Sequence, residues 1–144
     1  MTETRYQISE FGKLVGLTPF TLRYYEQEDL LKPRRDSVGQ RFYTQADQQW
    51  VEFLLHLKRT GMTIPELKQY VAWRAQGPQT IEQRLSLLCQ VRVEGRKSLA
   101  ELQESLTILN HKIAWYEGQE DRTIPATESF AAYLQRLAPS AQEN

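Results

Sequence analysis

The chain has 144 residues, 40% of them hydrophobic and 25% charged, and its 18 basic side chains balance its 18 acidic ones. This length and composition predict one folded domain, or a small domain with an appendage, and the zero net charge argues against a chain coated in positive charge. No apolar run approaches the roughly 18 residues of a membrane helix, and the polar start MTETRYQ lacks a signal-peptide core, so we expect a cytoplasmic protein without a membrane segment.

Two short helices joined by a tight turn are predicted first. Ser9 is expected to cap the first helix, with the apolar Ile8 packing before it and Gly16 ending it. Thr18 is expected to cap the second helix, and Pro19 suits its first position, where no amide donor is needed. Two short helices around a glycine turn are typical of a helix-turn-helix.

A small β-hairpin is predicted next. Two short extended arms flank the polar turn at 37–39, which predicts a wing beside the two helices. Positive charge concentrates here, because one acidic residue, Asp36, stands among four basic residues within a stretch of ten. The four basic residues are Lys32, Arg34, Arg35 and Arg41.

Two further helices complete the first half of the chain. The segment Thr44–Asp47 is a capping-box-like start, although Asp stands where Glu is usual, and Gly61 ends the helical spacing that follows. The segment Thr63–Glu66 is a second capping box, and the helix that it starts ends at Gly77. We therefore expect residues 1–77 to form one winged helix-turn-helix domain, a kind of domain that binds DNA.

The rest of the chain predicts one long helix. Apolar residues occupy the a and d positions of an unbroken heptad frame, in which Arg92 and Gly95 are the only poor members. The apolar positions are Leu85, Leu88, Leu99, Leu102, Leu106, Leu109, Ile113 and Tyr116. Because little sequence follows, the stripe is expected to pair with a second chain over 78–118, which leaves 119–144 as a short tail with one more helix within 123–137.

Three stretches of the sequence carry a resemblance to a known family. They are ISEFGKLVGLTPFTLRYYEQEDLLKPRR, GQRFY and LKRTGMTIPELKQYV, and together they resemble the MerR family of bacterial transcription regulators over residues 6–75. The resemblance implies a mainly all-α fold, with a winged helix-turn-helix domain followed by a long antiparallel coiled-coil dimerisation helix. It also implies a symmetric homodimer on double-stranded promoter DNA, which distorts an overlong promoter spacer for RNA polymerase when an effector binds.

The second helix carries the first candidates for DNA contact. Its start at Thr18 offers first-turn amides to a phosphate. The residues that project from its early turns toward the major groove are Thr21, Arg23 and Tyr24. Arg23 is the strongest candidate, as a donor to a base edge or phosphate, and the alternative is a surface arginine paired with Glu26 or Gln27. Tyr24 either donates to phosphate or packs half-buried, and Glu26 is expected to hold an arginine or a helix end within the domain.

The wing and a later helix supply further candidates. Those on the wing are Arg34 and Arg35 at its basic edge, and Arg41 and Tyr43 on the return strand. They would meet flanking phosphates or the minor groove, and the alternative is a solvated hairpin. Lys58 and Arg59 are expected to contact the outer backbone. Each phosphate contact releases counterions, so DNA binding should weaken steeply as salt rises.

The effector side departs from the metal-sensing branch of the family. Those members resemble one another in having paired cysteines near the long helix, whereas this chain has only Cys89. A structural zinc site takes about four ligands and would have to recruit His56, His111 or a second chain, so we expect no metal and no other cofactor. Cys89 is either a small packing residue or a reactive thiol beside Arg92.

Aromatic residues are the other candidates for sensing. With Cys89, the residues proposed for an effector pocket are Trp73, Trp115, Phe130 and Tyr133. Such rings could line an apolar pocket for a flat organic effector. The alternative is that they are simply core, because aromatic residues at helical spacing usually pack.

Two other functional classes have less support. We expect no enzyme, because no glycine-rich phosphate loop, no evident cysteine–histidine pair and no carboxylate cluster outside EQED is present in the sequence. A coiled-coil protein-interaction adaptor with a vestigial winged helix is the alternative function. It would bind no DNA at moderate salt and would keep its function after Arg23→Ala.

Overall fold

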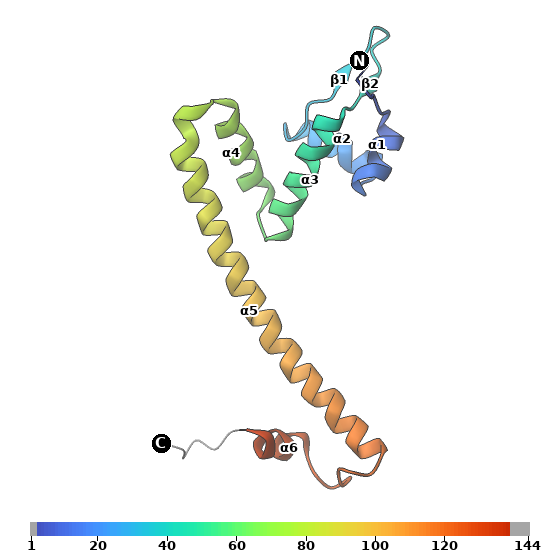
Figure 1. The fold of residues 1–144 in the computed structure, drawn as a ribbon, viewed down its shortest axis with the longest axis vertical. Helices are drawn as coiled ribbons and strands as arrows, with labels where there is room; N and C mark the ends of the chain where they lie inside the picture. Colours follow the sequence, from blue (N-terminus) through green and yellow to red (C-terminus); the bar gives the residue numbers. More distant parts are fainter. Residues whose placement is uncertain (1–2, 139–144) are drawn as a thin grey trace. The chain divides into compact units, whose positions relative to one another are not determined.

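The computed structural model describes residues 3–138, which are mostly helical (Figure 1). The chain divides into two compact units, Met1–Gly95 and Arg96–Asn144, and the division falls inside the long helix α5 (Ile81–Glu120). The predicted mainly all-α class, with a small hairpin wing and a long helix, is confirmed. The end of the predicted tail, residues 139–144, lies outside the described residues. No helix among the described residues is long and apolar enough to cross a membrane.

The first two helices form the predicted helix-turn-helix. Helix α1 (Ile8–Val15) ends where Gly16 adopts a left-handed φ of 74°, and helix α2 (Pro19–Gln27) follows at once. Thr18 caps α2 as predicted, because its hydroxyl accepts the backbone N–H of Thr21 at 3.1 Å. The cap and the left-handed glycine together fix the turn between the two helices.

The prediction that Ser9 caps α1 is wrong. Gln7 is the N-cap, and its backbone N–H donates to the Glu10 carboxylate at 3.4 Å, so Ile8 is the first helical residue. The helix begins earlier than predicted because the preceding residue, Tyr6, is already fixed by a backbone bridge to the wing. Capping residues alone do not reveal such a bridge.

The wing is a two-stranded antiparallel hairpin, in which strand β1 (Arg34–Arg35) pairs with strand β2 (Arg41–Phe42). Its turn is closed by one side chain. The Asp36 carboxylate accepts the backbone N–H of Val38 at 3.0 Å and that of Gln40 at 2.9 Å. The single acidic residue of the basic segment therefore has a structural role within the turn.

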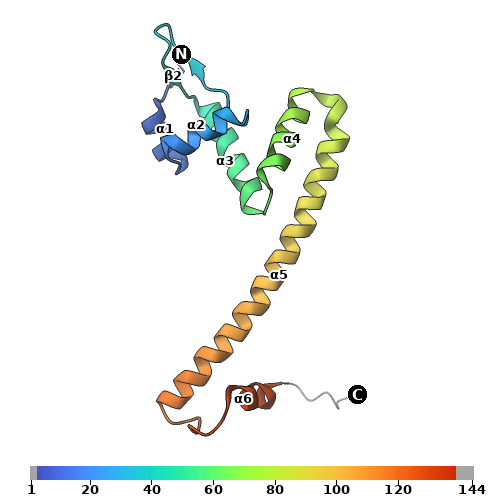
Figure 2. The same cartoon turned by 180° about the vertical axis from the view of Figure 1, so that it is seen from behind.

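Two longer helices follow the wing. Helices α3 (Gln45–Arg59) and α4 (Ile64–Ala75) begin at the two predicted capping boxes. At both, the threonine and the acidic residue three positions later accept each other's backbone N–H, so Asp serves in the first box as Glu does in the second. The chain then turns through a short 3-10 helix, η1 (Pro78–Thr80), into α5 (Figures 1 and 2).

One apolar core holds the first unit together. Its largest fully buried side chains are Phe11, Leu22, Tyr25, Leu30, Leu31, Tyr43, Val51, Leu54 and Leu67. The start of α5 also belongs to it, because Val91 is buried in this core and Leu88 packs against it. The first unit therefore extends past the expected boundary at residue 77 and into α5.

The second unit joins the end of α5 to helix α6 (Phe130–Leu137). Ile124 packs on Gly118, where a Cβ atom would clash with the isoleucine side chain. The Trp115 indole N–H donates to the backbone carbonyl of Glu128 at 3.2 Å. The short helix predicted in the tail is thus confirmed over its last part, and it is tied back to α5.

Candidate nucleic-acid interface

Helix α2 presents one face to the core and the opposite face outward. Leu22 and Tyr25 are buried and anchor the helix. At about 100° per residue, the opposite face carries the positions with the spacing i, i+3, i+4 and i+7. These are Phe20, Arg23, Tyr24 and Gln27, and all four are exposed. Two of the predicted DNA contacts, Arg23 and Tyr24, therefore lie on the outward face.

The Arg23 guanidinium is available for an external partner. Among residues 3–138 it forms no salt bridge and no side-chain hydrogen bond. The acidic residue nearest to it along the helix, Glu26, instead accepts from Arg41, with Nε and Oε2 2.7 Å apart. The alternative prediction, in which Arg23 pairs with Glu26 or Gln27, is therefore not observed among the described residues.

Glu26 joins helix α2 to the wing. Besides the Arg41 contact, its carboxylate lies 3.9 Å from the Arg35 guanidinium. The prediction that Glu26 holds an arginine within the domain is confirmed. Because a guanidinium has five N–H donors and this ion pair uses the one at Nε, Arg41 keeps its terminal donors while its position is fixed.

The N-terminal segment also meets the wing, which sequence reasoning missed. The backbone bridge of Tyr6 brings Glu3 within 2.8 Å of the Arg34 guanidinium. It also brings the Arg5 guanidinium over the Phe42 ring, 4.1 Å from the ring centroid. The only available signal was one more basic residue in the polar start, because no local pattern predicts pairing between segments so distant in sequence.

The structure corrects the prediction that Tyr43 contacts DNA. Its side chain is 0% exposed and stacks on Phe11 with ring centroids 4.4 Å apart. Its hydroxyl has no hydrogen-bond partner among the described residues, and burial raises its pKa, with a further rise from the Glu26 carboxylate. Tyr43 is buried because α1 packs over the wing at this residue, so it supports the fold instead of meeting DNA.

The remaining predicted contacts lie on α2 and at the end of α3. Thr18 is exposed, and its hydroxyl donates to that of the half-buried Thr21 at 3.1 Å, so both side chains serve the cap. Lys58 and Arg59 are exposed in the last turn of α3, with the Lys58 ammonium 5.9 Å from the Tyr25 ring centroid. The candidate interface thus draws on α2, the wing and α3, all within the first unit.

Comparison with known proteins decides the family. A model of the MerR HTH family regulatory protein matches residues 6–72. An uncharacterized HTH-type transcriptional regulator of Haemophilus influenzae is 35% identical over 113 residues, which cover 78% of this chain and 84% of that protein. The chain belongs to the MerR family. It is a DNA-binding transcriptional regulator.

Solved structures of MerR-family regulators share this fold. HiNmlR, a MerR family regulator lacking the sensor domain and bound to promoter DNA, matches with a TM-score of 0.78 and 33% identity, over 84% of this chain and 97% of that chain. A MerR family regulator from Listeria monocytogenes matches with a TM-score of 0.73 and 31% identity, over 82% and 94% of the two chains. These relatives are regulators and not enzymes, and the adaptor alternative is not favoured.

The regulator ZntR of Escherichia coli is a further relative, 31% identical over 110 residues, which cover 73% of this chain and 78% of ZntR. Within residues 3–138 of the present MerR-family protein, no three His, Cys, Asp or Glu side chains lie together as they would to hold a metal ion. Cys89 is half-buried, with an Arg92 guanidinium nitrogen 3.8 Å from its Sγ.

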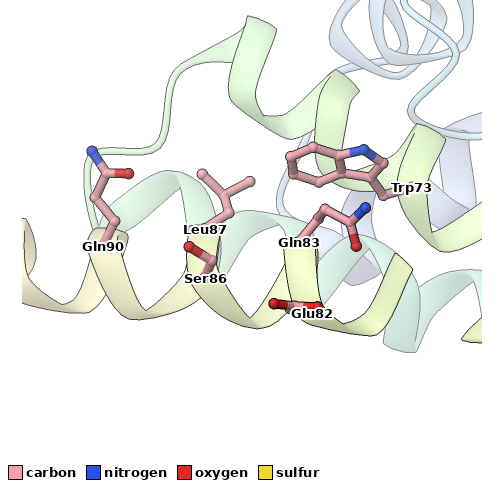
Figure 3. A pocket seen from close by; sticks show the side chains of 6 residues that line it. All are labelled: Trp73, Glu82, Gln83, Ser86, Leu87 and Gln90. Atoms are coloured by element: carbon pink, nitrogen blue, oxygen red, sulfur yellow. The ribbon is translucent and has the colours of Figure 1, made fainter. Parts of the chain in front are cut away.

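The effector candidates of this MerR-family regulator divide between the two units. Trp73 lines a pocket of about 510 Å³ in the first unit, and Figure 3 shows its ring beside Gln83 of α5. The other lining residues follow along α5 and are Glu82, Ser86, Leu87 and Gln90. Cys89 is not part of this lining.

Three of the effector candidates form one aromatic cluster in the second unit. The Trp115 and Phe130 ring centroids are 5.6 Å apart, and those of Phe130 and Tyr133 are 6.4 Å apart. The Lys112 ammonium lies over this cluster, 4.7 Å from the Trp115 centroid and 4.3 Å from that of Phe130. These contacts pack α6 on the end of α5, and a role in sensing stays a prediction.

Proposed function

We propose that this MerR-family regulator acts as a homodimer that binds a dyad-symmetric promoter site and distorts the spacer DNA in response to an effector. One observation carries the proposal. Arg23 lies on the outward face of α2, exposed and without an ion-pair partner among residues 3–138. An arginine held there by a rigid helix can donate two hydrogen bonds to a guanine edge or to a phosphate.

Three elements would contact the DNA. Helix α2 would enter the major groove, with its N-terminal residues toward the base edges. Pro19 has no N–H and that of Thr21 is taken by the Thr18 hydroxyl, which leaves the backbone N–H of Phe20 for a phosphate. The groups proposed for the flanking phosphates and the outer backbone are Arg34, Arg35, Arg41, Lys58 and Arg59. Since each neutralised phosphate releases counterions, the affinity should fall steeply as salt rises.

The proposed dimer rests on the long helix α5. Its apolar stripe beyond Gly95 is between 47% and 57% exposed in the single chain. These stripe residues are Leu99, Leu102, Leu106, Leu109, Ile113 and Tyr116. An apolar stripe of this length is stable in water when a second helix covers it. Leu85 is also exposed and available for pairing, whereas Leu88 packs on the core of its own first unit.

Antiparallel pairing of two such helices would give the dimer a two-fold axis. The two copies of α2 would then stand at a fixed separation, so the DNA site would be dyad-symmetric. Binding by both copies would exceed the affinity of one, because the second contact becomes intramolecular.

RNA polymerase and a small-molecule effector complete the proposal. Distortion of the spacer by the dimer would align the promoter elements for the polymerase, as the family resemblance implies, and this would occur in the cytoplasm. The effector would be a flat organic molecule that the aromatic side chains can stack on. The candidates in the first unit are Trp73 and Cys89, and those in the second unit, as a separate cluster, are Trp115, Phe130 and Tyr133.

Fluorescence anisotropy with a labelled DNA fragment from upstream of the protein's own gene tests the proposal. Arg23→Ala is expected to weaken binding by about 1–3 kcal/mol, or roughly 5- to 150-fold, because a base or phosphate contact is lost. Lys97→Ala removes the same charge from an exposed site on α5 and should leave the affinity unchanged. Equal affinities of wild type and Arg23→Ala would contradict the assignment of α2 to DNA.

A further inference from the structure

The side chain of Phe20 is exposed and contributes little buried apolar surface to the fold. Its side chain is 78% exposed, although burial of a phenyl ring normally stabilises a protein. Within residues 3–138 no other aromatic ring and no cation packs on it. The core of the first unit is complete without it, since Leu22 and Tyr25 already anchor α2. The ring is therefore free to meet a partner outside the chain.

The position of Phe20 indicates what that partner is. It stands in the first turn of α2, directly after Pro19, which fixes the start of the helix. It shares the outward face with Arg23 and Tyr24, at the spacing i, i+3 and i+4. If Arg23 reaches a base edge in the major groove, Phe20 stands over the same groove and closer to the helix N-terminus, from which base edges are read.

The chemistry of the phenyl ring limits which group of the DNA it can contact favourably. A phenyl group neither donates nor accepts a conventional hydrogen bond, so it cannot read the donor and acceptor pattern of guanine, cytosine or adenine. Thymine alone presents an apolar group in the major groove, its C5-methyl, and phenylalanine is one of the side chains that contact it. A ring pressed against phosphate or water would gain nothing.

We propose that Phe20 is a specificity-determining residue that contacts the C5-methyl group of a thymine in each half of the DNA site. The inference rests on the proposed function, because it assigns one base contact within that interface. Arg23 supplies hydrogen-bond donors on the outward face, and Phe20 supplies an apolar contact.

Deoxyuridine substitution tests the contact, because uracil pairs as thymine does but lacks the C5-methyl. A nuclease footprint first locates the bound DNA site. Each thymine in that site is then replaced in turn, together with its symmetry mate, and binding is measured by anisotropy. Wild type is expected to lose about fourfold in affinity per half-site at one position, the effect of burying roughly one methyl group. Phe20→Ala should lose at least as much on thymine DNA, and should show no further loss when that thymine becomes uracil.

Two variants separate recognition from folding and charge. Phe20→Leu keeps an apolar side chain and should keep the preference for thymine over uracil. Because Phe20 is exposed, Phe20→Ala should retain the wild-type urea midpoint and helical circular dichroism. Gln27→Ala truncates another exposed side chain on the same face, two turns further along, and should leave the thymine preference intact.

The outcomes distinguish this inference from the proposed function. Wild-type binding that is unaffected by uracil at every position would overturn the inference alone, as would a Phe20→Ala variant that still prefers thymine. If wild type bound no DNA fragment, the proposed function would fail and this contact with it. A thymine preference that disappears only with Phe20→Ala supports the inference.

Discussion

At the scale of single residues, the Glu26 carboxylate has the least obvious role in the interface. It lies on α2 beside residues that are proposed to face phosphates. A phosphate would repel this carboxylate, because both are negatively charged. Its partners, however, are Arg41 at 2.7 Å and Arg35 at 3.9 Å, both on the wing. Glu26 therefore links the helix proposed for the major groove to the hairpin proposed for the flanking backbone.

Glu26→Gln separates the two effects, because charge and geometry predict opposite signs. Removing a negative charge near phosphates should tighten DNA binding, whereas releasing the wing arginines should weaken it. We expect weaker binding by about fivefold, since a partly buried ion pair contributes about 1 kcal/mol. DNA titrations monitored by anisotropy measure the change.

Glu28→Gln is the matched control for this substitution. It removes the same charge from the same helix end, but its partner is Lys68 of α4, at 2.9 Å, and not the wing. We expect little change in DNA affinity for this variant. Tighter binding by Glu26→Gln would show that the carboxylate acts as a simple repulsive charge and would remove its linking role.

Interactions between neighbours in the sequence can be predicted from the sequence better than contacts between distant segments. The caps at Thr18, Thr44 and Thr63 were predictable, because a cap depends on neighbours a few residues away. The burial of Tyr43 was not, because its environment is made by Phe11 of α1. Basic residues were found by composition alone, but which of them carry a carboxylate partner depends on tertiary contacts.

At the scale of elements, the turn between α1 and α2 depends on a glycine inside α1. The backbone N–H of Leu17 donates to the Gly12 carbonyl at 2.9 Å, and a Cβ on Gly12 would lie 2.5 Å from the Leu17 carbonyl oxygen. Real Cβ atoms essentially never approach an atom so closely, and this neighbour is backbone. The close approach of α1 to the backbone of the turn therefore requires a residue without a side chain at this position.

Gly12→Ala is expected to destabilise the first unit by about 1–3 kcal/mol, because the turn must shift to admit the methyl group. Urea unfolding followed by circular dichroism should show a lower midpoint. Ser9→Ala, on the same helix, is the control and should change stability by less than about 0.5 kcal/mol, since Gln7 and not Ser9 caps α1. An unchanged midpoint for Gly12→Ala would mean that the turn is not close-packed.

Hydrophobic periodicity, together with capping and helix-ending residues, predicted most of the helices. The exact ends of the helices were predicted less well. The capping boxes placed the starts of α3 and α4, and the heptad frame predicted α5. The frame did not predict that α5 contributes Val91 to the core of the first unit, because heptad spacing describes a stripe and not what covers it. Nor did it predict that Gly118 stays helical, where the packing of Ile124 favours a residue without a side chain.

At the scale of the whole molecule, the exposed stripe of α5 predicts the oligomeric state. Leu102→Asp combined with Leu109→Asp should give a monomer, because paired carboxylates would have to be buried at the helix–helix contact. Sedimentation equilibrium measures the mass. The DNA affinity should fall at the same time, because avidity is lost.

Two substitutions on the other side of α5 provide the control. Ala100→Asp combined with Thr107→Asp adds the same charges at heptad positions outside the stripe, where both residues are exposed. This variant should remain a dimer. A dimer that persists with both leucines replaced would remove the coiled-coil pairing from the proposal.

We propose that this MerR-family regulator binds a symmetric site between two promoter elements. A nuclease footprint of the purified protein on the DNA upstream of its own gene, and of the adjacent divergent gene, tests it most directly. We predict protection of a dyad within a promoter spacer, with protection that weakens as salt rises. A well-folded dimer that protects no DNA at low or moderate salt would contradict the claim.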